Sequence, residues 1–391
     1  MAMISILKRY RLGAFVHLRG GYGDAVCAGV ERFWKEHPNV NIHFAGAEKI
    51  GSPGWAKRCD GILANPTFPM AAEALKALPC PVVLVTMRYQ DLPFPRVGVD
   101  REAAGRMAAR YYLDRGFRHL AYLGEDEHPG NDRRLTGFSA EIAAEDLPAP
   151  RYFAMQAFTS TAPFVLDRGT LDFLRRGPKP LAVLAARDDL AGVFLAVCQG
   201  LGLVVPAAVV VMGMDDYAAF CEACAPKLSS VATNGARVGY EGMALLLEAV
   251  QGSTPGPVRR LVPPIGVVAR SSTDAFAVED ELVRRALEQI WQHHGCKVRI
   301  KELAAALYTN RRTLELRFRR CLNRSPYDLA LALRLVKAQQ LLAGADWTAA
   351  RIARETGFHD APHFSTLFKK KTGLTPLTWR RRGGVPHTPP G

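Results

Sequence analysis

Three short polar stretches carry residue types that could bind a small molecule. They are Asn131-Asp132-Arg133-Arg134, Ala186-Arg187-Asp188-Asp189 and Met214-Asp215-Asp216. Carboxylates accept and guanidinium groups donate several hydrogen bonds in fixed directions, and a molecule covered in hydroxyl groups needs such partners. If the three stretches face one cleft, they predict a binding site for a small sugar.

An aspartate at the start of a helix can instead serve as an N-cap. Its side chain then accepts a hydrogen bond from the first helical turn. We expect Asp189 and Asp216 to be caps of this kind. For Asp188 and Asp215, capping and ligand binding both stay open.

Residues 10 to 270 alternate short apolar runs with amphipathic stretches, a pattern that predicts βαβ units and a doubly wound α/β fold. Continuous apolar strands suit a parallel sheet that is buried on both faces. The predicted strands are Gly13–His17, Gly61–Leu63, Val82–Thr86, His119–Leu123, Leu181–Ala185 and Val209–Gly213. The predicted helices are Ala25–Glu36, Arg101–Arg115, Leu135–Ala144, Asp189–Leu201 and Val238–Val250. Ligands of such sheets bind beyond the carboxyl ends of the strands, where the Ala186 and Met214 stretches fall.

The glycine-rich segment Arg19–Asp24 follows the first predicted strand, but Val26 breaks the GxGxxG pattern of a dinucleotide site. The chain also contains no phosphate loop, no GxSxG and no HExxH. An enzyme that acts on a sugar or nucleotide and is anchored to DNA is one alternative, which turnover of pentoses would reveal. A constitutive DNA-bending protein whose first part only dimerises is another.

The positive charge of the chain is concentrated at one end. The last 111 residues contain 21 Lys and Arg against 8 Asp and Glu, whereas the rest is almost balanced, and the whole chain carries +14. The basic residues are interleaved with apolar residues at helical spacing. This pattern indicates a folded module that binds a polyanion, attached to a larger neutral part.

Composition excludes several classes of protein and site. Apolar residues make up 48% and charged residues 23% of the chain, as in soluble globular proteins. No run approaches the ~20 apolar residues of a membrane span, and we expect no signal peptide. The eight dispersed cysteines predict free thiols in a reducing cytoplasm, with Cys221 and Cys224 as ordinary thiols. We expect no metal and no cofactor.

A degenerate repeat occupies the basic end. Each copy has a short helix, a tight turn and a longer helix, and each ends in a Ser-Pro or Thr-Pro pair at 325–326 and 375–376. Asn310 and Asp360 are the expected N-caps of the longer helices. The intervening residues Pro326–Leu342 read as one rigid helix. Two helix-turn-helix units follow from this pattern, and the second helix of each would enter a major groove of DNA.

The exposed faces of the two longer helices should read DNA. Arg can bind guanine and Glu can accept from cytosine, while lysines at a helix end suit phosphate contacts. The candidate DNA-binding residues are Arg311, Arg312, Glu315, Leu316, Arg319, Ala361, Pro362, His363, Ser365, Thr366, Lys369 and Lys370.

The segment from about residue 12 to 270 resembles the periplasmic-binding-protein-like sugar domain of LacI-type repressors. The resemblance rests on "VGVDREAAGRMAARYYLDRGFRHLAYLG", "RRLTGF", "ARDDLAGVFLAVCQGLGLVVPAAVVVMGMDD" and "PKLSSVATNGARVGYEGMALLLEAV". It implies two lobes joined by three crossing strands, with an effector bound between them. It also implies four ligand contacts, namely Asp24, Arg134, Asp188 and Asp215. Arg187 departs from the asparagine that is frequent at its position.

The end of the chain resembles the AraC-type DNA-binding domain through "NRRTLELRFRRCLNRSPYDLALALRLVKAQQLL" and "ARIARETGFHDAPHFSTLFKKKTGLTPLTWRRR". Leu316 departs from the basic or polar residue that is usual there, and it could contact a thymine methyl group. A LacI-like domain followed by an AraC-like domain is the order found in xylose operon regulators.

Together these resemblances imply a sugar-responsive transcription regulator with two domains. Residues 1–272 would sense D-xylose or another pentose, and residues 280–391 would bind double-stranded DNA. We further expect a cytoplasmic homodimer, formed through the first lobe, and we leave a contact with RNA polymerase open. No membrane partner is expected.

Overall fold

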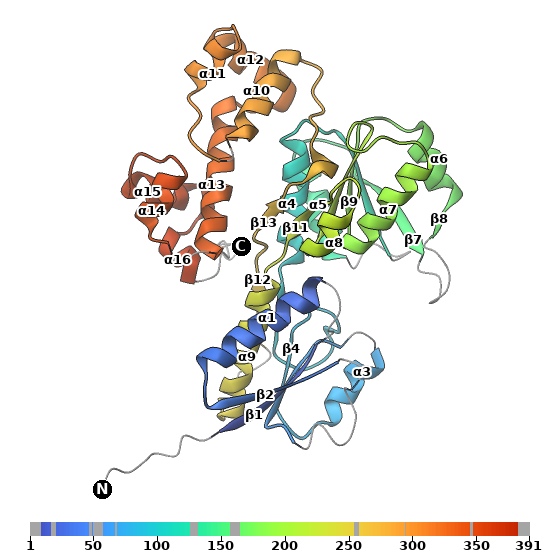
Figure 1. Cartoon of the computed structure of the whole chain (residues 1–391), viewed down its shortest axis with the longest axis vertical. Coiled ribbons are helices and arrows are strands. Elements are labelled where there is room, and N and C mark those ends of the chain that lie inside the picture. The colour runs from blue at the N-terminus through green and yellow to red at the C-terminus, as the bar shows by residue number, and fades with distance from the viewer. Residues whose placement is uncertain are drawn as a thin grey trace. The chain divides into compact units, whose positions relative to one another are not determined.

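The structure is a computed structural model that describes residues 9–16, 21–46, 49, 58–66, 69–125, 132–156, 165–253, 258–293, 295–344 and 347–381. The chain divides into two compact units. One comprises Met1–Asp100 and Thr233–Pro263, and the other comprises Arg101–Ala232 and Pro264–Gly391. We call the first unit the first lobe. Within the second unit, residues 101–232 and 264–273 form the second lobe, and residues 280–381 form the helical region (Figure 1).

The first lobe is built on a parallel sheet with the strand order β12-β5-β4-β3-β1-β2. Helices α1 and α9 pack against each other over one apolar cluster, and α3 lies over a second cluster that includes Phe15 and Leu84. The strands are β1 (Tyr10–Phe15), β2 (Val40–Ala45), β3 (Gly61–Ala64), β4 (Val82–Leu84), β5 (Arg96–Val99) and β12 (Arg259–Val262). The helices are α1 (Gly21–Glu36), α3 (Pro69–Ala74) and α9 (Gly235–Val250), with a short 3-10 turn at Leu75–Ala77.

The second lobe has the strand order β13-β11-β10-β9-β6-β7-β8, which is parallel except for the two edge strands β13 and β8. Alternate residues of a strand face opposite sides. Tyr152 therefore stacks on Tyr122, and Phe153 stacks on Phe194 of α7. The strands are β6 (His119–Gly124), β7 (Arg151–Gln156), β8 (Val165–Leu166), β9 (Leu181–Ala185), β10 (Val209–Met214), β11 (Ser229–Ala232) and β13 (Gly266–Val268). The helices are α4 (Arg101–Leu113), α5 (Arg133–Ala143), α6 (Arg168–Arg176), α7 (Asp188–Gly200) and α8 (Ala218–Ala223), with a 3-10 turn at Ser271–Thr273.

Helices α4 and α5 cross in backbone contact because each has a glycine at the crossing. A Cβ atom on Gly105 would lie 1.9 Å from the carbonyl oxygen of Arg134, and one on Gly137 would lie 2.0 Å from that of Glu102. Real Cβ atoms do not come so close to a backbone oxygen. The close crossing fixes the first turn of α5, which carries Arg134.

The helical region contains two small cores that share one helix. Leu329 of α13 belongs to the core under α10, α11 and α12, and Leu335 of the same helix belongs to the core under α14, α15 and α16. The helices are α10 (Glu281–Gln292), α11 (Ile300–Ala306), α12 (Arg311–Leu322), α13 (Pro326–Gly344), α14 (Ala349–Glu355), α15 (Ala361–Thr372) and α16 (Pro376–Arg381). This arrangement gives the two helix-turn-helix units that the repeat predicts.

The predicted fold class is confirmed: parallel α/β lobes are followed by a helical double helix-turn-helix region. Each predicted strand and helix is present with bounds shifted by a few residues, except that His17 lies outside the described residues. The polypeptide passes between its two units after residues 100, 232 and 263, in agreement with three crossing strands. The proposed boundary between residues 272 and 280 stays a prediction.

Candidate functional site

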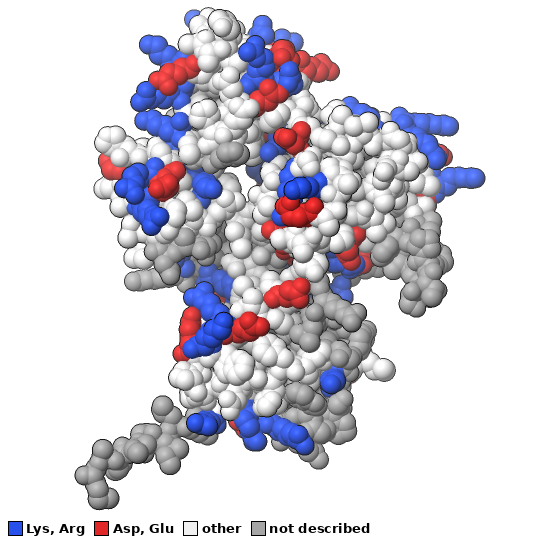
Figure 2. All heavy atoms as spheres, in the orientation of Figure 1, with Lys and Arg blue, Asp and Glu red and all other residues white. Residues whose placement is uncertain are grey.

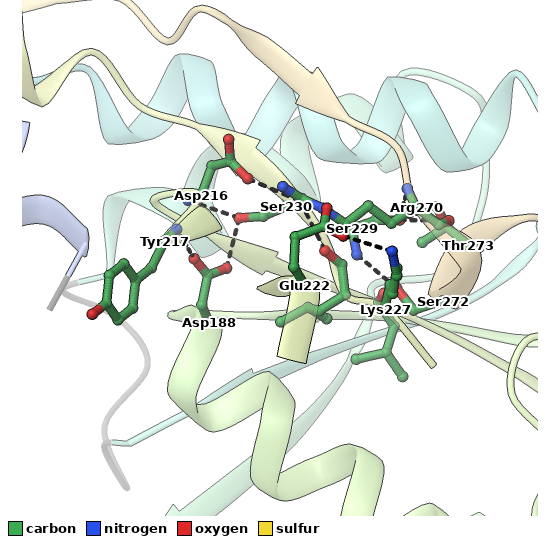
Figure 3. A network of polar contacts seen from close by, with 12 residues as sticks. Asp188, Asp216, Tyr217, Glu222, Lys227, Ser229, Ser230, Arg270, Ser272 and Thr273 are labelled. Atoms are coloured by element: carbon green, nitrogen blue, oxygen red, sulfur yellow. Dashed lines mark hydrogen bonds and ion pairs between the residues drawn. The ribbon is translucent and has the colours of Figure 1, made fainter. Parts of the chain in front are cut away.

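Asp188 lies at the junction of β9 and α7, where its carboxylate is almost fully enclosed. Asp188 is only 5% exposed. Its carboxylate accepts hydrogen bonds from the Ser230 hydroxyl at 2.6 Å and from the Tyr217 backbone N–H at 2.8 Å (Figure 3). A Cβ on Gly213 would lie 2.1 Å from Asp188 Oδ1, so only glycine fits opposite it. Burial raises the pKa of Asp188 to about 7, although both hydrogen bonds oppose the shift. The side chain therefore links the segments that follow β9 and β10 to β11.

Asp215 and Asp216 form the turn between β10 and α8. Both have a positive φ, of 96° and 51°, which aspartate tolerates better than most residues. The backbone N–H of Asp215 donates to Val231 O at 3.0 Å, and the Asp216 carboxylate accepts from Arg270 Nη1 at 2.9 Å. The half-buried Asp215 side chain is close enough to Arg134 to help raise the pKa of that guanidinium.

The expectation that Asp189 and Asp216 are N-caps is wrong. The N-cap residue of α7 is Arg187 and that of α8 is Tyr217, and neither side chain caps its helix by a hydrogen bond. Asp189 lies inside the first turn of α7, where Arg187 holds it with two hydrogen bonds of 2.9 and 2.8 Å. Asp216 is held by Arg270 instead of by the helix (Figure 3). Asp189 also accepts from the Leu190 N–H at 2.9 Å, so its carboxylate is shared between Arg187 and the first turn of α7, whereas the Asp216 carboxylate is bound by Arg270.

Arg134 is held in a fixed orientation at the start of α5. Its Nε and Nη2 donate to the two carboxylate oxygens of Asp132 at 2.8 and 3.0 Å, and its Nη1 donates to Ala186 O at 2.6 Å. Asp132 caps α5 and also accepts from the Tyr122 hydroxyl at 2.5 Å. Burial opposes its ionisation, but Arg134 keeps the pKa of Asp132 below its ordinary value. Within the described residues, three of the five N–H donors of Arg134 are used and two remain.

Two further residues at this edge were not predicted to bind a ligand. Arg187 follows Ala186 and pairs with Glu125 as well as with Asp189, with about a third of its side chain exposed. Tyr217 is partly exposed and stacks on Phe220 with nearly parallel rings. The sequence signal for Tyr217 was that an aromatic residue follows Asp215 by two positions in a predicted strand-end loop. The sequence signal for Arg187 was an arginine at a position where asparagine is frequent.

Asp24 lies in the first lobe, whereas the other three predicted ligand contacts lie in the second lobe. The sequence placed it in a loop after the first strand. The structure places it in the first turn of α1, with its side chain exposed, because that helix begins at Gly21. Residues 17–20 of the same segment lie outside the described residues.

The two helix-turn-helix units are capped as predicted. Asn310 accepts from the Thr313 N–H at 2.8 Å and Asp360 accepts from the His363 N–H at 2.7 Å. Phe318 of α12 and Phe364 of α15 are fully buried, which turns the opposite faces of both helices outward. Figure 2 shows basic side chains over this region, with acidic ones among them.

The predicted DNA-binding residues differ in exposure. Most are exposed, while Ala361 and Ser365 are half-buried, and Glu315 is half-buried and paired with Arg311 at 2.7 Å. The exposed ones are Arg311, Arg312, Leu316, Arg319, Pro362, His363, Thr366, Lys369 and Lys370. The pairing of Arg311 with Glu315 means that DNA must compete for these two side chains.

Arg334 organises the second turn and was missed by sequence reasoning. This buried residue of α13 donates from Nε to Thr356 O at 2.8 Å, and its guanidinium carbon lies 4.0 Å from the centre of the Phe358 ring. It therefore fixes the loop that precedes α15. A basic residue in an apolar helix was its only sequence signal.

The second lobe and the helical region are joined by contacts around the end of α4. Asp114 forms a buried ion pair with Arg324, and Arg118 Nη2 donates to Cys321 O at 3.1 Å. Arg115 lies between two aromatic rings, with its guanidinium carbon 3.5 Å from the centres of both Tyr111 and Trp291. These contacts connect the lobe that carries Arg134 to α10 and α12.

All eight cysteines are free thiols, as predicted. In the described part of the chain, no three His, Cys, Asp or Glu residues are grouped so as to hold a metal ion. None of the helices described combines the length and apolar character of a bilayer crossing.

Comparison with known proteins identifies both parts of the chain. A periplasmic binding protein-like domain matches residues 109–273 and a helix-turn-helix domain matches residues 303–382. The chain is 26% identical to the xylose operon regulatory protein of Haemophilus influenzae, over 82% of this chain and 84% of that one. The protein of the same name from Escherichia coli K12 is also 26% identical, over 82% and 83%.

A solved structure supports the same fold. A xylose-binding transcription activator matches 96% of this chain and 98% of its own length, with a TM-score of 0.59 and 23% identity. These relatives are transcription regulators, so they give no support to the alternative of a sugar-acting enzyme. The chain is therefore a DNA-binding transcription regulator and a homologue of the xylose operon regulatory proteins.

Proposed function

We propose that the effector of this regulator is D-xylose or another pentose, bound at the carboxyl ends of β6, β9 and β10. The observation that carries the proposal is the convergence there of Arg134, Arg187 and Asp215. Arg134 donates a hydrogen bond to the carbonyl oxygen of Ala186, which precedes Arg187. The negative charge of Asp215 is one of the causes that raise the pKa of Arg134. The names of the relatives favour xylose among the sugars.

Arg134 would bind sugar hydroxyls without moving. Asp132 and Ala186 already fix its guanidinium, so its two remaining donors point in set directions and lose little freedom on binding. Asp215 would accept hydrogen bonds from sugar hydroxyl groups. The partly exposed ring of Tyr217 offers an apolar face for a sugar ring.

Asp188 and Asp24 play different parts in this proposal. Asp188 was expected to touch the sugar, but its carboxylate is enclosed by Ser230, Tyr217 and Gly213. We infer that it positions the strand ends that carry Arg187 and Asp215. Asp24 would contact the sugar from the first turn of α1.

The helical region would bind DNA through α12 and α15. Each chain carries two reading helices, so each would occupy two successive major grooves, roughly 34 Å apart along the duplex. Arg312, Arg319 and Thr366 are exposed for base or phosphate contacts, and Lys369 and Lys370 for phosphates.

We further propose a cytoplasmic homodimer whose first lobes form the interface, with RNA polymerase as a partner left open. The sugar would change how the two chains present their helical regions. It can do so only in proportion to its difference in affinity for the two arrangements of the protein.

Calorimetric titration with a panel of aldoses tests the sugar proposal. We expect heat with at least one pentose, and we expect none with Asp215→Ala. A matched control is Asp146→Ala, which removes another positive-φ aspartate from an exposed turn of the second lobe and should bind as wild type does. Absence of heat and of any thermal shift with every aldose would contradict the sugar proposal. Consumption of the sugar would restore the enzyme alternative.

A further inference from the structure

One tyrosine in the helical region has a costly backbone conformation and, among the residues that the structure describes, nothing to pack against. Tyr308 has a φ of 54° and is 92% exposed. A bulky residue with positive φ is strained, and such strain persists only where something compensates for it. Among the described residues, its hydroxyl has no hydrogen-bond partner and its ring no packing cluster. Neither packing nor hydrogen bonding within the described part of the chain explains a tyrosine here.

The second helix-turn-helix unit shows what this position normally requires. In the first unit the Thr309 N–H donates to Ala304 O at 2.9 Å, and in the second the Phe358 N–H donates to Ala353 O at 2.8 Å. These matching bonds align Tyr308 with Gly357, which has a φ of 69°. Glycine adopts this conformation without a steric cost. The first turn carries a tyrosine where the same turn in the second unit carries the residue best suited to the backbone.

A second tyrosine with the same backbone serves as an internal comparison. Tyr89 of the first lobe has a φ of 53°, but it is half-buried and packs on the cluster that contains Leu92. Its carbonyl oxygen also accepts from Arg96 at 3.0 Å. The strain at Tyr89 is therefore compensated inside the fold, and the strain at Tyr308 is not.

Tyr308 lies just before the N-terminus of α12, the end of the helix that would enter the DNA groove first. It precedes Asn310, the N-cap, and the exposed residues Arg311 and Arg312. A helix N-terminus and two arginines attract phosphate groups. Tyrosine hydroxyls are among the side-chain donors that bind DNA phosphates and fix the register of a protein on the duplex.

We propose that Tyr308 is a DNA-contacting residue whose hydroxyl donates a hydrogen bond to a backbone phosphate beside the site read by α12. The inference rests on the proposed DNA-binding role of that helix. The contact would position the helix without reading sequence. It explains why the first turn retains a tyrosine at a glycine position.

The test uses the full-length protein and a duplex that the wild type selects from a random-sequence pool. Tyr308→Phe keeps the ring and the backbone strain but loses the hydroxyl, and we expect its affinity to fall roughly tenfold. The fall should be equal on a mismatched duplex, and the salt dependence should be unchanged because the hydroxyl is neutral. Tyr89→Phe is the matched control and should bind as the wild type does.

A second variant tests the strain itself. Tyr308→Gly should bind DNA at least as weakly as Tyr308→Phe, while its melting temperature rises by roughly 2 °C or more. Equal affinity of Tyr308→Phe and wild type would overturn the inference, and so would a loss confined to the selected duplex, which indicates a base contact. If the wild type selects no duplex at all, the proposed DNA-binding role fails first.

Discussion

The guanidinium group of Arg115 lies over the indole ring of Trp291, with its central carbon 3.5 Å from the ring centre. Arg115 is 5% exposed, and burial lowers its pKa to about 10. Its Nε and Nη1 have no hydrogen-bond partner within the described residues, so the rings of Trp291 and Tyr111 stabilise the charge. Because Trp291 belongs to α10, this stack anchors the helical region to the second lobe.

Removing the indole should therefore loosen that anchor. We expect Trp291→Ala to lower the free energy of unfolding by about 2–4 kcal/mol, since it exposes apolar surface and uncovers a buried cation. Scanning calorimetry would measure the change. Trp34→Ala is the control, because Trp34 is 41% exposed on α1 of the first lobe. Equal effects of the two substitutions would contradict the anchoring role.

The ion pair between Asp114 and Arg324 makes a second test of the same connection. Breaking a buried pair from one side costs ~3–5 kcal/mol, and Arg110, whose Nη1 lies 3.7 Å from Asp114 Oδ1, keeps the loss here near the lower end of that range. We expect this loss in Arg324→Met, and a large part of it should be recovered in the double variant Asp114→Leu/Arg324→Met. The exposed pair Arg299–Glu302 supplies the control, and Glu302→Gln should change stability by less than ~1 kcal/mol. Purely additive losses in the double variant would show that the pair is not coupled.

The raised pKa of Asp188 predicts a stability that falls as the pH rises. The folded state holds this proton up to about pH 7, whereas an unfolded aspartate releases it near 3.9. Between these values stability should fall by up to ~1.4 kcal/mol per pH unit. Asp188→Asn cannot lose a proton, so its deficit in melting temperature relative to wild type should narrow between pH 4 and pH 8. Parallel curves for the two proteins would contradict the assignment.

Arg134 should be irreplaceable by lysine. A lysine cannot bind both oxygens of Asp132 and reach Ala186 at the same time. We expect Arg134→Lys to weaken pentose binding by roughly 10- to 100-fold, corresponding to about 1.4–3 kcal/mol. Calorimetry would measure it, and Arg133→Lys, an exposed neighbour on α5, is the control. Undiminished affinity in Arg134→Lys would remove this residue from the site.

The lysines at the end of α15 should act on DNA through charge alone. Each phosphate contact contributes about 0.9 to the slope of log affinity against log salt concentration. We expect Lys369→Ala to reduce that slope by about this amount while leaving the ranking of duplex sequences unchanged. Fluorescence anisotropy across a salt series would measure it. An altered sequence ranking would show that Lys369 reads bases.

Sequence periodicity predicted the elements well because buried parallel strands such as Leu181–Ala185 are continuous apolar runs. Short edge strands such as Arg259–Val262 were missed because they carry charged residues on an exposed edge. The caps at Asn310 and Asp360 were predictable from local chemistry. The partners of Asp189 and Asp216 were not predicted: Arg187 lies only two residues before Asp189, but Arg270 reaches Asp216 only in the folded chain.

The contacts of the buried arginines were even less predictable from the sequence. Arg115 and Arg334 lie in segments that read as ordinary amphipathic helix, yet each ends against an aromatic ring from a distant part of the chain. No spacing rule links Arg115 with Trp291. Likewise, the enclosure of Asp188 depends on Ser230 and Gly213, which belong to two other strands. The sequence pattern predicted the end of β9 correctly, but it could not show that the carboxylate of Asp188 faces inward.

The three passages of the chain between its units, after residues 100, 232 and 263, make each unit discontinuous in sequence. A gene fragment that starts at Met1 and ends before residue 263 therefore encodes neither unit whole. A single proteolytic cut within either unit would still leave both attached, because other covalent links persist. Lobe-swapped chimaeras of this regulator consequently need at least three junctions, and the natural places for them are those same passages.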